Sequence, residues 1–347
     1  REYKELNLYL DSIRLRIMKI QRELEIEKVS VSANSVLDRF QGKDAPVQRT
    51  LFEVFREHND KCVQLSGTDM APATVQRYET SLKHTRDFVW ETYHKKDVLL
   101  DEVSRQFIED YEFWLKTEKK CCHNTATKYL KNFKKITRIA LAKGWMKNDP
   151  FLEIRFSLDK VEPDFLEDSE IQKLISKEID IPRLSQVRDI FVFCCFTGLA
   201  FSDIHGLRKE HIVEDSNGVR WIRKGRQKTK IMCNIPLMEI PLKILEKYST
   251  NEYCKKHGVL FPVLCNQKMN AYLKELADIC GIKKTLTTHV GRHTFATFAL
   301  ANGVSIESVA KMLGHTNVQM TRHYARVLDR TVIREMSQIK MDLHFSM

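Results

Sequence analysis

Arginine, histidine and tyrosine side chains recur in three short segments near the carboxy-terminal end of the 347-residue chain, at positions 288–294, 313–315 and 322–324. The Arg292 guanidinium is planar and can donate hydrogen bonds to two oxygens of one phosphate. His289 and His315 can supply further donors or act as acid–base groups. A tyrosine hydroxyl beside such groups can attack a phosphodiester and form a phosphotyrosyl ester. We therefore predict phosphoryl-transfer chemistry with Tyr324 as the nucleophile.

Two structural readings compete with this prediction. A single tyrosine is more often a core or surface residue than a nucleophile, and the assignment of Tyr324 depends on its position nine residues after His315. His289 and His293 are four residues apart, as in a zinc-binding helix. The H-E-x-x-H pattern requires a glutamate where this chain has Val290, and no third ligand is evident. A metal site is not expected.

A basic turn precedes these segments in the chain. Short runs at 219–222 and 233–236 predict two strands, with a turn at 225–230 between them. The tip of such a hairpin can reach a bound phosphodiester, and we predict that Lys228 places its ammonium group near the leaving oxygen. Arg223 and Arg226 are predicted to bind DNA phosphates, the alternative being that the other basic residues of the turn are simply solvated.

Hydrophobic periodicity and capping residues predict the helices that position these groups. Thr287 or Thr288 is the expected N-cap of the helix that carries Arg292, and Gly314 is expected to end the helix before His315. Thr316 and Gln319 form a possible capping box for a short helix that ends near Tyr324. The helices predicted in this half of the chain are 183–197, 238–249, 266–280, 288–302, 305–313, 317–326 and 328–340.

The preceding part of the chain is predicted to be entirely helical, with helices at 48–65, 73–94, 103–120 and 123–143 after a charged helix at 1–30. The 123–143 helix carries a one-sided basic stripe. An ordinary solvated face is the simpler reading of such a stripe, but its position upstream of a phosphate-handling cluster favours DNA contact. The predicted DNA-binding residues of this helix are Lys128, Lys131, Lys135 and Arg138.

The length and composition of the chain agree with a folded two-domain protein. We predict a helical connector at 1–45, a helical domain at 46–156, an acidic linker at 157–168 and a second domain at 169–347. The net charge of +11 gives about even odds of a nucleic-acid partner by itself. The nine cysteines lack metal-ligand spacing, and reduced, buried thiols in a cytosolic, bacterial protein are expected. No membrane span is expected.

The ordered motifs resemble those of the tyrosine recombinases of the phage integrase family, over about residues 46–340. Besides the segments above, the match includes the stretch 196–204 (Phe-Thr-Gly-Leu-Ala-Phe-Ser-Asp-Ile) and the Gln-Lys-Thr sequence around Lys228. The resemblance implies a mainly α protein: a two-domain DNA clamp with an all-helical, SAM-like core-binding domain and a mixed α/β catalytic domain containing a small β-hairpin sheet. It also implies a tetramer on synapsed DNA and strand exchange through 3′-phosphotyrosine intermediates, without metal or ATP. Lys228, His289, Arg292 and His315 would assist phosphoryl transfer, and Tyr324 would attack.

One position departs from the family pattern. Members usually have an arginine directly after Thr-Gly-Leu, whereas this chain has Ala200. The loss of one preorganised donor can cost a few kcal/mol of transition-state stabilisation, on the order of 3 kcal/mol. The gap resembles one found in integrases of Bacteroides-type conjugative and mobilisable transposons. Arg208, Arg223 and Arg226 are the candidates to supply the missing guanidinium.

Several alternatives stay open from the sequence. A type IB topoisomerase-like nicking–closing enzyme would use similar chemistry, and a DNA-binding regulator with a degenerate site would account for Ala200. Integration, excision and resolution cannot be distinguished, nor can the participation of accessory DNA-bending or directionality proteins. Because the chain starts without methionine, we expect a missing amino-terminal portion, which could hold an arm-binding module joined by the 1–30 helix.

Overall fold

The computed structural model describes residues 2–27, 31–42 and 49–324. The chain divides into two compact units, Arg1–Lys160 and Val161–Met347, each with its own hydrophobic core. Most of the described chain is helical, and its only strands form a three-stranded sheet in the second unit. The predicted fold class, mainly α with a small β-hairpin sheet, is confirmed. None of the described helices is both long and apolar enough to cross a membrane.

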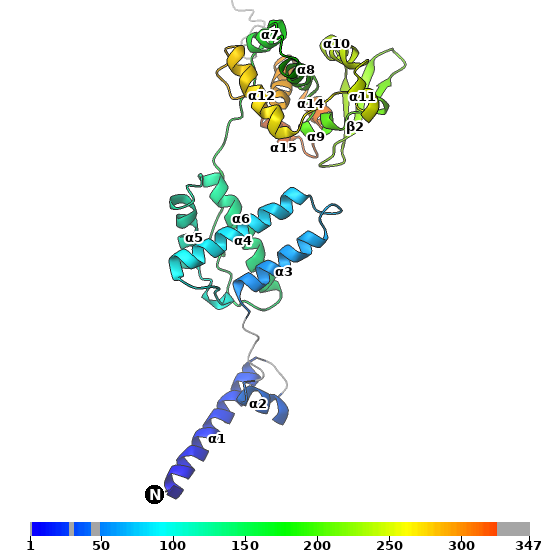
Figure 1. Cartoon of the computed structure of the whole chain (residues 1–347). Coiled ribbons are helices and arrows are strands. Elements are labelled where there is room, and N and C mark those ends of the chain that lie inside the picture. Colours follow the sequence, from blue (N-terminus) through cyan, green and yellow to red (C-terminus); the bar gives the residue numbers. More distant parts are fainter. Residues whose placement is uncertain (1, 28–30, 43–48, 325–347) are drawn as a thin grey trace, which may run out of the picture. The chain divides into compact units, whose positions relative to one another are not determined.

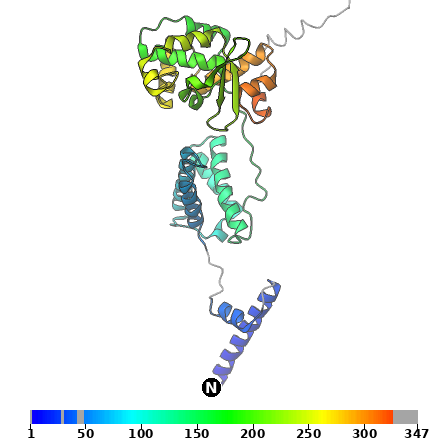
Figure 2. The same ribbon diagram turned by 90° about the vertical axis from the view of Figure 1, so that its right-hand side faces the viewer.

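The first unit contains a bundle of four main helices, visible together in Figure 2. These are α3 (Leu51–Gln64), α4 (Pro72–Tyr93), α5 (Arg105–Thr117) and α6 (His123–Ala142), with a short 3-10 turn, η1 (Leu100–Glu102), between α4 and α5. Aromatic side chains fill the space between them: Phe88 packs against Phe107 and Tyr111, and Phe133 contacts both of those rings. Each predicted helix of this bundle occurs within a few residues of its expected bounds.

Two further helices precede the bundle, α1 (Glu2–Ile26) and α2 (Ala33–Phe40). Ser32 caps α2 by accepting a hydrogen bond from the backbone of Ser35. Ile20 and Leu24 are buried, whereas most apolar side chains of α1 are exposed. The sequence predicted α1 as part of one helix and missed α2.

A buried helix lies at the centre of the second unit. This helix, α8 (Pro182–Thr197), packs against α7 (Asp168–Ser176), α10 (Glu239–Tyr248), α12 (Asn266–Ile279) and α13 (Thr288–Ala301), as Figure 1 shows. Because neighbours cover several of its faces, its second half (190–197) is almost entirely apolar, whereas its first half keeps polar residues such as Arg183 and Gln186. The remaining helices are α9 (Phe201–His205), η2 (Lys209–His211), α11 (Glu252–His257), α14 (Ile306–Leu313) and α15 (Gln319–Arg322).

The sheet is antiparallel, in the order β1 (Ile212–Glu214), β2 (Arg220–Gly225) and β3 (Met232–Pro236). In the β2–β3 register Ile222 faces Ile235, and both side chains are buried against the helices. The turn between them is closed by hydrogen bonds from Arg226 N to Ile231 O and from Lys230 N to Arg226 O. The hairpin and its basic turn were predicted, whereas β1 was not, because three residues are too few to show a period.

Three local predictions need correction. Thr316 and Gln319 do not form a capping box; instead the Asn317 side chain accepts a hydrogen bond from Gln319 N. Thr287 occupies the N-cap position of α13 but makes no side-chain cap bond, and Asn270 accepts the hydrogen bond from Thr288 N instead.

The third correction concerns the thiols. All nine cysteines lie among the described residues and are free, but Cys122 and Cys265 are exposed instead of buried. The predicted helix at 328–340 lies outside the described residues.

Candidate active site

Arg292 is held by the carboxy-terminal ends of two helices. Its side chain leaves the middle of α13 and is buried, with 3% of the residue exposed. Nη1 donates to the carbonyl of Gly198, which caps α8, and Nη2 donates to the carbonyl of Leu313, the last residue of α14, both at 2.7 Å. Such carbonyls lack intrahelical partners and carry the negative end of the helix dipole. They therefore fix a buried cation that has no acidic partner among the described residues.

Two glycines make room for this arrangement. Gly198 and Gly314 end α8 and α14 in the left-handed conformation, at φ +67° and +61°. A Cβ on Gly198 would lie 2.4 Å from the ring of Phe295, and one on Gly314 would lie 2.7 Å from Cδ of Arg226 and Sγ of Cys233. Both positions therefore require glycine for conformation and for space.

His315 follows Gly314, and both of its ring nitrogens make hydrogen bonds that hold the imidazole in place. Nε2 lies 3.0 Å from Nη2 of Arg292, and Nδ1 lies 2.9 Å from Oγ1 of Thr321. Because a guanidinium can only donate, Nε2 accepts and Nδ1 carries the proton. Burial, followed by the charges of Arg292 and Arg226, lowers the pKa of His315 to about 4. The imidazole is therefore neutral near pH 7.

Tyr324 lies just beyond α15, with 9% of the residue exposed. Its ring is parallel to that of His315 at 6.0 Å and tilted against that of His293 at 4.9 Å. Burial and the charge of Arg226 lower the pKa of Arg292, and the nearby Tyr324 and Cys233 oppose this shift, so Tyr324 lies within electrostatic reach of the guanidinium. The predicted nucleophile thus lies beside the predicted phosphate-binding group.

His289 lies one turn before His293 on α13, and their rings make an edge-to-face contact at 4.3 Å. Partial desolvation lowers the pKa of His289, although part of the residue is exposed, and the charges of Arg292, Arg226 and Lys228 lower it further. The sequence considered His293 only as a zinc ligand. In the structure it is buried between His289 and Tyr324, and its position next to Arg292 on a buried helix was the available signal.

The basic turn of the hairpin supplies the remaining cations. Lys228 is exposed, and its charge contributes to the lowered pKa of His289, so its ammonium group lies within electrostatic reach of the cluster. Arg226 lies deeper, with 11% of its side chain exposed, and its Nε is 3.6 Å from Oδ2 of the buried Asp203. The structure therefore brings Arg292, His289, His315, Tyr324 and the hairpin cations into one cluster.

The predicted DNA-binding residues of α6 belong to the first unit. Lys128, Lys131, Lys135 and Arg138 are all exposed on one face of α6. The last three of them, together with Lys134 and Phe156, line a cavity of about 470 Å³ that has no acidic lining residue.

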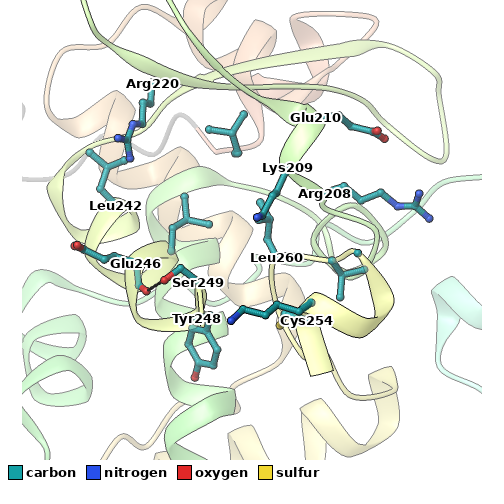
Figure 3. Close-up of a pocket in the computed structure, with 15 residues that line it drawn as sticks. Arg208, Lys209, Glu210, Arg220, Leu242, Glu246, Tyr248, Ser249, Cys254 and Leu260 are labelled. Carbon is teal, nitrogen blue, oxygen red and sulfur yellow. Dashed lines mark hydrogen bonds between the residues drawn. The ribbon is translucent and has the colours of Figure 1, made fainter. Parts of the chain in front are cut away.

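A cavity of about 830 Å³ in the second unit contains none of the clustered residues. It lies between η2, α10 and α11, and Figure 3 shows Tyr248, Lys209 and Arg208 among the side chains around it. The size of a cavity therefore does not identify the reactive site in this protein.

Comparison with known proteins agrees with this arrangement. Residues 50–158 match the phage integrase SAM-like domain, and residues 164–331 match the phage integrase family. A tyrosine recombinase of Pseudothermotoga lettingae is 29% identical over 265 residues, covering 74% of this chain and 88% of the relative. The tyrosine recombinase XerD of Oceanobacillus iheyensis is 26% identical, covering 73% and 87%.

Two solved structures have a similar fold at low sequence identity. A lambda integrase (75–356) dimer bound to a COC′ core site matches with a TM-score of 0.65 at 18% identity, covering 81% of this chain and 97% of that chain. The Tn1549 transposon integrase, in complex with a circular intermediate DNA, matches with a TM-score of 0.63 at 18% identity, covering 84% and 99%.

The chain belongs to the phage integrase family of tyrosine recombinases. It is a site-specific recombinase, an enzyme that cuts DNA strands and rejoins them to new partners.

Proposed function

We propose that Tyr324 performs the cutting step by attacking the scissile phosphorus. The Tyr324 oxygen–phosphorus bond forms, the bond from phosphorus to the 5′-oxygen breaks, and the strand is left joined to the enzyme through a 3′-phosphotyrosine. The phosphotyrosyl ester conserves the energy of the phosphodiester bond that was broken. A 5′-hydroxyl of the partner strand can therefore attack this ester, release the tyrosine and complete the exchange. The position of the nearly buried Tyr324, stacked on His315, which itself contacts the buried Arg292, is the observation that carries this proposal.

The proposal requires two proton transfers, one from the attacking tyrosine and one to the leaving 5′-oxygen. The tyrosine loses its proton to His289, whose lowered pKa leaves the imidazole free to accept it near pH 7. The departing 5′-oxygen takes a proton from the Lys228 ammonium. Arg292 and His315 bind the nonbridging oxygens. His315 can do so as a neutral donor if the ring gives up its contact with Thr321.

We propose that duplex DNA is bound by both units, which act as the core-binding domain (46–156) and the catalytic domain (169–347). The exposed cations of α6, together with Arg223 and Arg226 of the hairpin, would contact phosphates. A tetramer on two synapsed sites, as in the lambda integrase tetramer bound to a Holliday junction, would complete the exchange.

The biological setting we propose is the integration and excision of a mobile element. The Tn1549 transposon integrase is among the structural neighbours, which supports an element of this kind. Ala200 favours the integrases of Bacteroides-type conjugative and mobilisable transposons. Recovery of recombinant joints between a circular element and a target duplex would test this assignment, whereas relaxation of supercoils without joints would favour the topoisomerase alternative.

The test of the chemistry is capture of the covalent intermediate. DNA that becomes linked to the protein in expressing cells is sequenced to find the cleavage site, and a suicide duplex nicked beside that site is then incubated with pure protein. Mass mapping should find the DNA on the peptide containing Tyr324. Tyr324→Phe should form no covalent complex, whereas Tyr272→Phe, a partly buried tyrosine of α12, should react like the parent. Undiminished cutting by Tyr324→Phe would overturn the proposal, and specific binding without any cutting would favour the regulator.

A further inference from the structure

Ala200 leaves the cluster without the second arginine that related recombinases place after Thr-Gly-Leu. Ala200 is the N-cap of α9, and its carbonyl accepts hydrogen bonds from Asp203 N and Ile204 N. A methyl group at this position cannot contact a phosphate. A cation for the second nonbridging oxygen must therefore come from elsewhere in the fold.

Two of the three candidate arginines are directed elsewhere. Arg208 is exposed at the large cavity beside η2, together with Lys209 and Glu210 (Figure 3). Arg223 is also exposed, and it lies near Asp215 in the turn between β1 and β2, whose pKa is lowered by hydrogen bonds from Trp221 and from the backbone and, to a smaller extent, by the charge of Arg223. Neither contributes to the shifted pKa of Arg292, His289 or His315.

Arg226 is the candidate that reaches the cluster. Its Cδ and Cγ pack over Gly314, close enough that a Cβ there would overlap them, and Nη1 lies 3.4 Å from the Gly314 carbonyl. Its charge acts on Arg292, His289 and His315 together. The guanidinium thus lies at the turn that carries His315 and within electrostatic reach of Arg292.

Asp203 holds this arginine in place. The carboxylate is 2% exposed, accepts a hydrogen bond from Gln227 N at 2.9 Å through Oδ1, and pairs with Nε of Arg226 at 3.6 Å through Oδ2. Asp203 lies one turn after Ala200 on α9. The carboxylate therefore draws the base of the hairpin turn towards the position where the arginine is missing.

The hydrogen-bond inventory distinguishes the two guanidinium groups. The Arg292 guanidinium already donates hydrogen bonds to two backbone carbonyls and to His315. Arg226 makes only the long Nη1 contact to Gly314 among the described residues, so most of its donors are available to a ligand. With Lys228 also present, the positive charges exceed the one buried carboxylate, and a pentacoordinate phosphate, which gains negative charge during attack, would balance the excess.

We propose that Arg226 is a catalytic residue that binds a nonbridging oxygen of the scissile phosphate in place of the arginine absent at position 200, and that Asp203 positions it. This inference rests on the proposed phosphotyrosine chemistry. It removes the main support for an inactive remnant site, because the guanidinium is supplied by the β2–β3 turn.

The test measures single-turnover cleavage of the suicide duplex at saturating DNA. Arg226→Ala should slow cleavage by about 10²- to 10³-fold, the usual effect of losing one such donor. Arg226→Lys should recover part of the rate because it keeps a charge. Arg208→Ala, the matched control, should cleave at the parent rate. Thermal unfolding of each variant checks the fold, and the double variant Asp203→Asn/Arg226→Gln avoids leaving an unpaired buried carboxylate if Arg226→Ala unfolds.

A chemical readout separates phosphate binding from a merely structural effect. Replacing one nonbridging oxygen of the scissile phosphate by a methyl group removes the charge that Arg226 neutralises. With one methylphosphonate diastereomer, Arg226→Ala and the parent should therefore cleave at similar rates, while Arg292→Ala stays slow with that diastereomer. Asp203→Asn should slow cleavage in the same pattern as Arg226→Ala, but by a smaller factor. Adding Ala200→Arg to the Arg226→Ala variant should raise its cleavage rate at least tenfold.

Parent-like cleavage by Arg226→Ala, or a defect that persists equally with both diastereomers, would overturn the assignment. The proposed function fails differently, because the parent protein itself would then form no covalent complex.

Discussion

The two units carry their positive charge in opposite ways. In the catalytic unit Arg292 and Arg226 are almost fully enclosed and are held by helix-end carbonyls and by Asp203. In the core-binding unit Lys128, Lys131 and Arg138 are exposed on α6. Enclosed, fixed cations can stabilise a transition state without reorganising, whereas exposed cations on long side chains adapt to a phosphate backbone. Under the proposed function, positive charge would serve chemistry in the catalytic unit and DNA affinity in the core-binding unit.

The largest effect should follow removal of the most enclosed cation. Arg292→Ala should reduce the cleavage rate at saturating DNA by about 10²- to 10³-fold, since the donor is preorganised. DNA affinity should change little, because the outer phosphate contacts remain. Single-turnover kinetics and a binding titration on the same duplex separate the two quantities. If Arg292→Ala weakened DNA binding but cleaved at the parent rate, the roles assigned to the two units would be wrong.

The second prediction concerns the space beside the enclosed cations. Gly314→Ala forces a side chain into the left-handed region and against Arg226 and Cys233. The conformational cost is about 1–2 kcal/mol, and overpacking adds about 1–3 kcal/mol. Chemical denaturation should report this loss, and cleavage should slow as Arg226 moves. Gly218→Ala, at a positive-φ glycine with no atom within 4 Å, is the control that carries the conformational cost alone. Equal losses for both variants would mean that the contact with Arg226 is unimportant.

The third prediction is a dependence of stability on pH that arises at His315. The folded pKa is lowered from 6.5 to about 4, so the unfolded chain binds the proton more tightly between these values. The contribution of His315 to the free energy of unfolding should therefore be fully present above about pH 6.5. It should be lost as the pH falls towards 4, by on the order of 2–3 kcal/mol. His315→Gln should flatten this part of the profile. His58, His84, His211 and His289, whose pKa values are also lowered by burial, should leave a residual slope in the same direction.

The smallest effect is expected on the exposed face of α6. Lys131→Ala and Arg138→Ala should each weaken DNA binding a few-fold and reduce the slope of log affinity against log salt by about 1. The cleavage rate at saturation should be unchanged. Lys116→Ala on α5, which removes a lysine paired with Glu112, is the control and should leave the salt slope intact. A lower rate at saturation would show that the units do not divide affinity and chemistry as proposed.

Much of this arrangement was predictable from local sequence. The helices of the bundle were predicted because their apolar residues recur every three or four positions, and the hairpin because two short apolar runs flank a basic turn. Gly314 was recognised as the end of α14, which correctly placed His315 in a turn. By contrast, α9 and β1 span five and three residues, too few to show a period.

The sequence by itself determined the types of reactive groups and their order along the chain, since these are properties of residues and spacing. Only the tertiary structure decided which groups meet. The enclosure of Arg292 depends on the carbonyl ends of α8 and α14, and Thr321 fixes the tautomer of His315. The choice of Arg226 over Arg208 and Arg223 depends on Asp203 and Gly314, which lie 23 and 88 residues away in the chain. Contacts over such separations leave no periodic signal, because they arise from packing between elements and not within them.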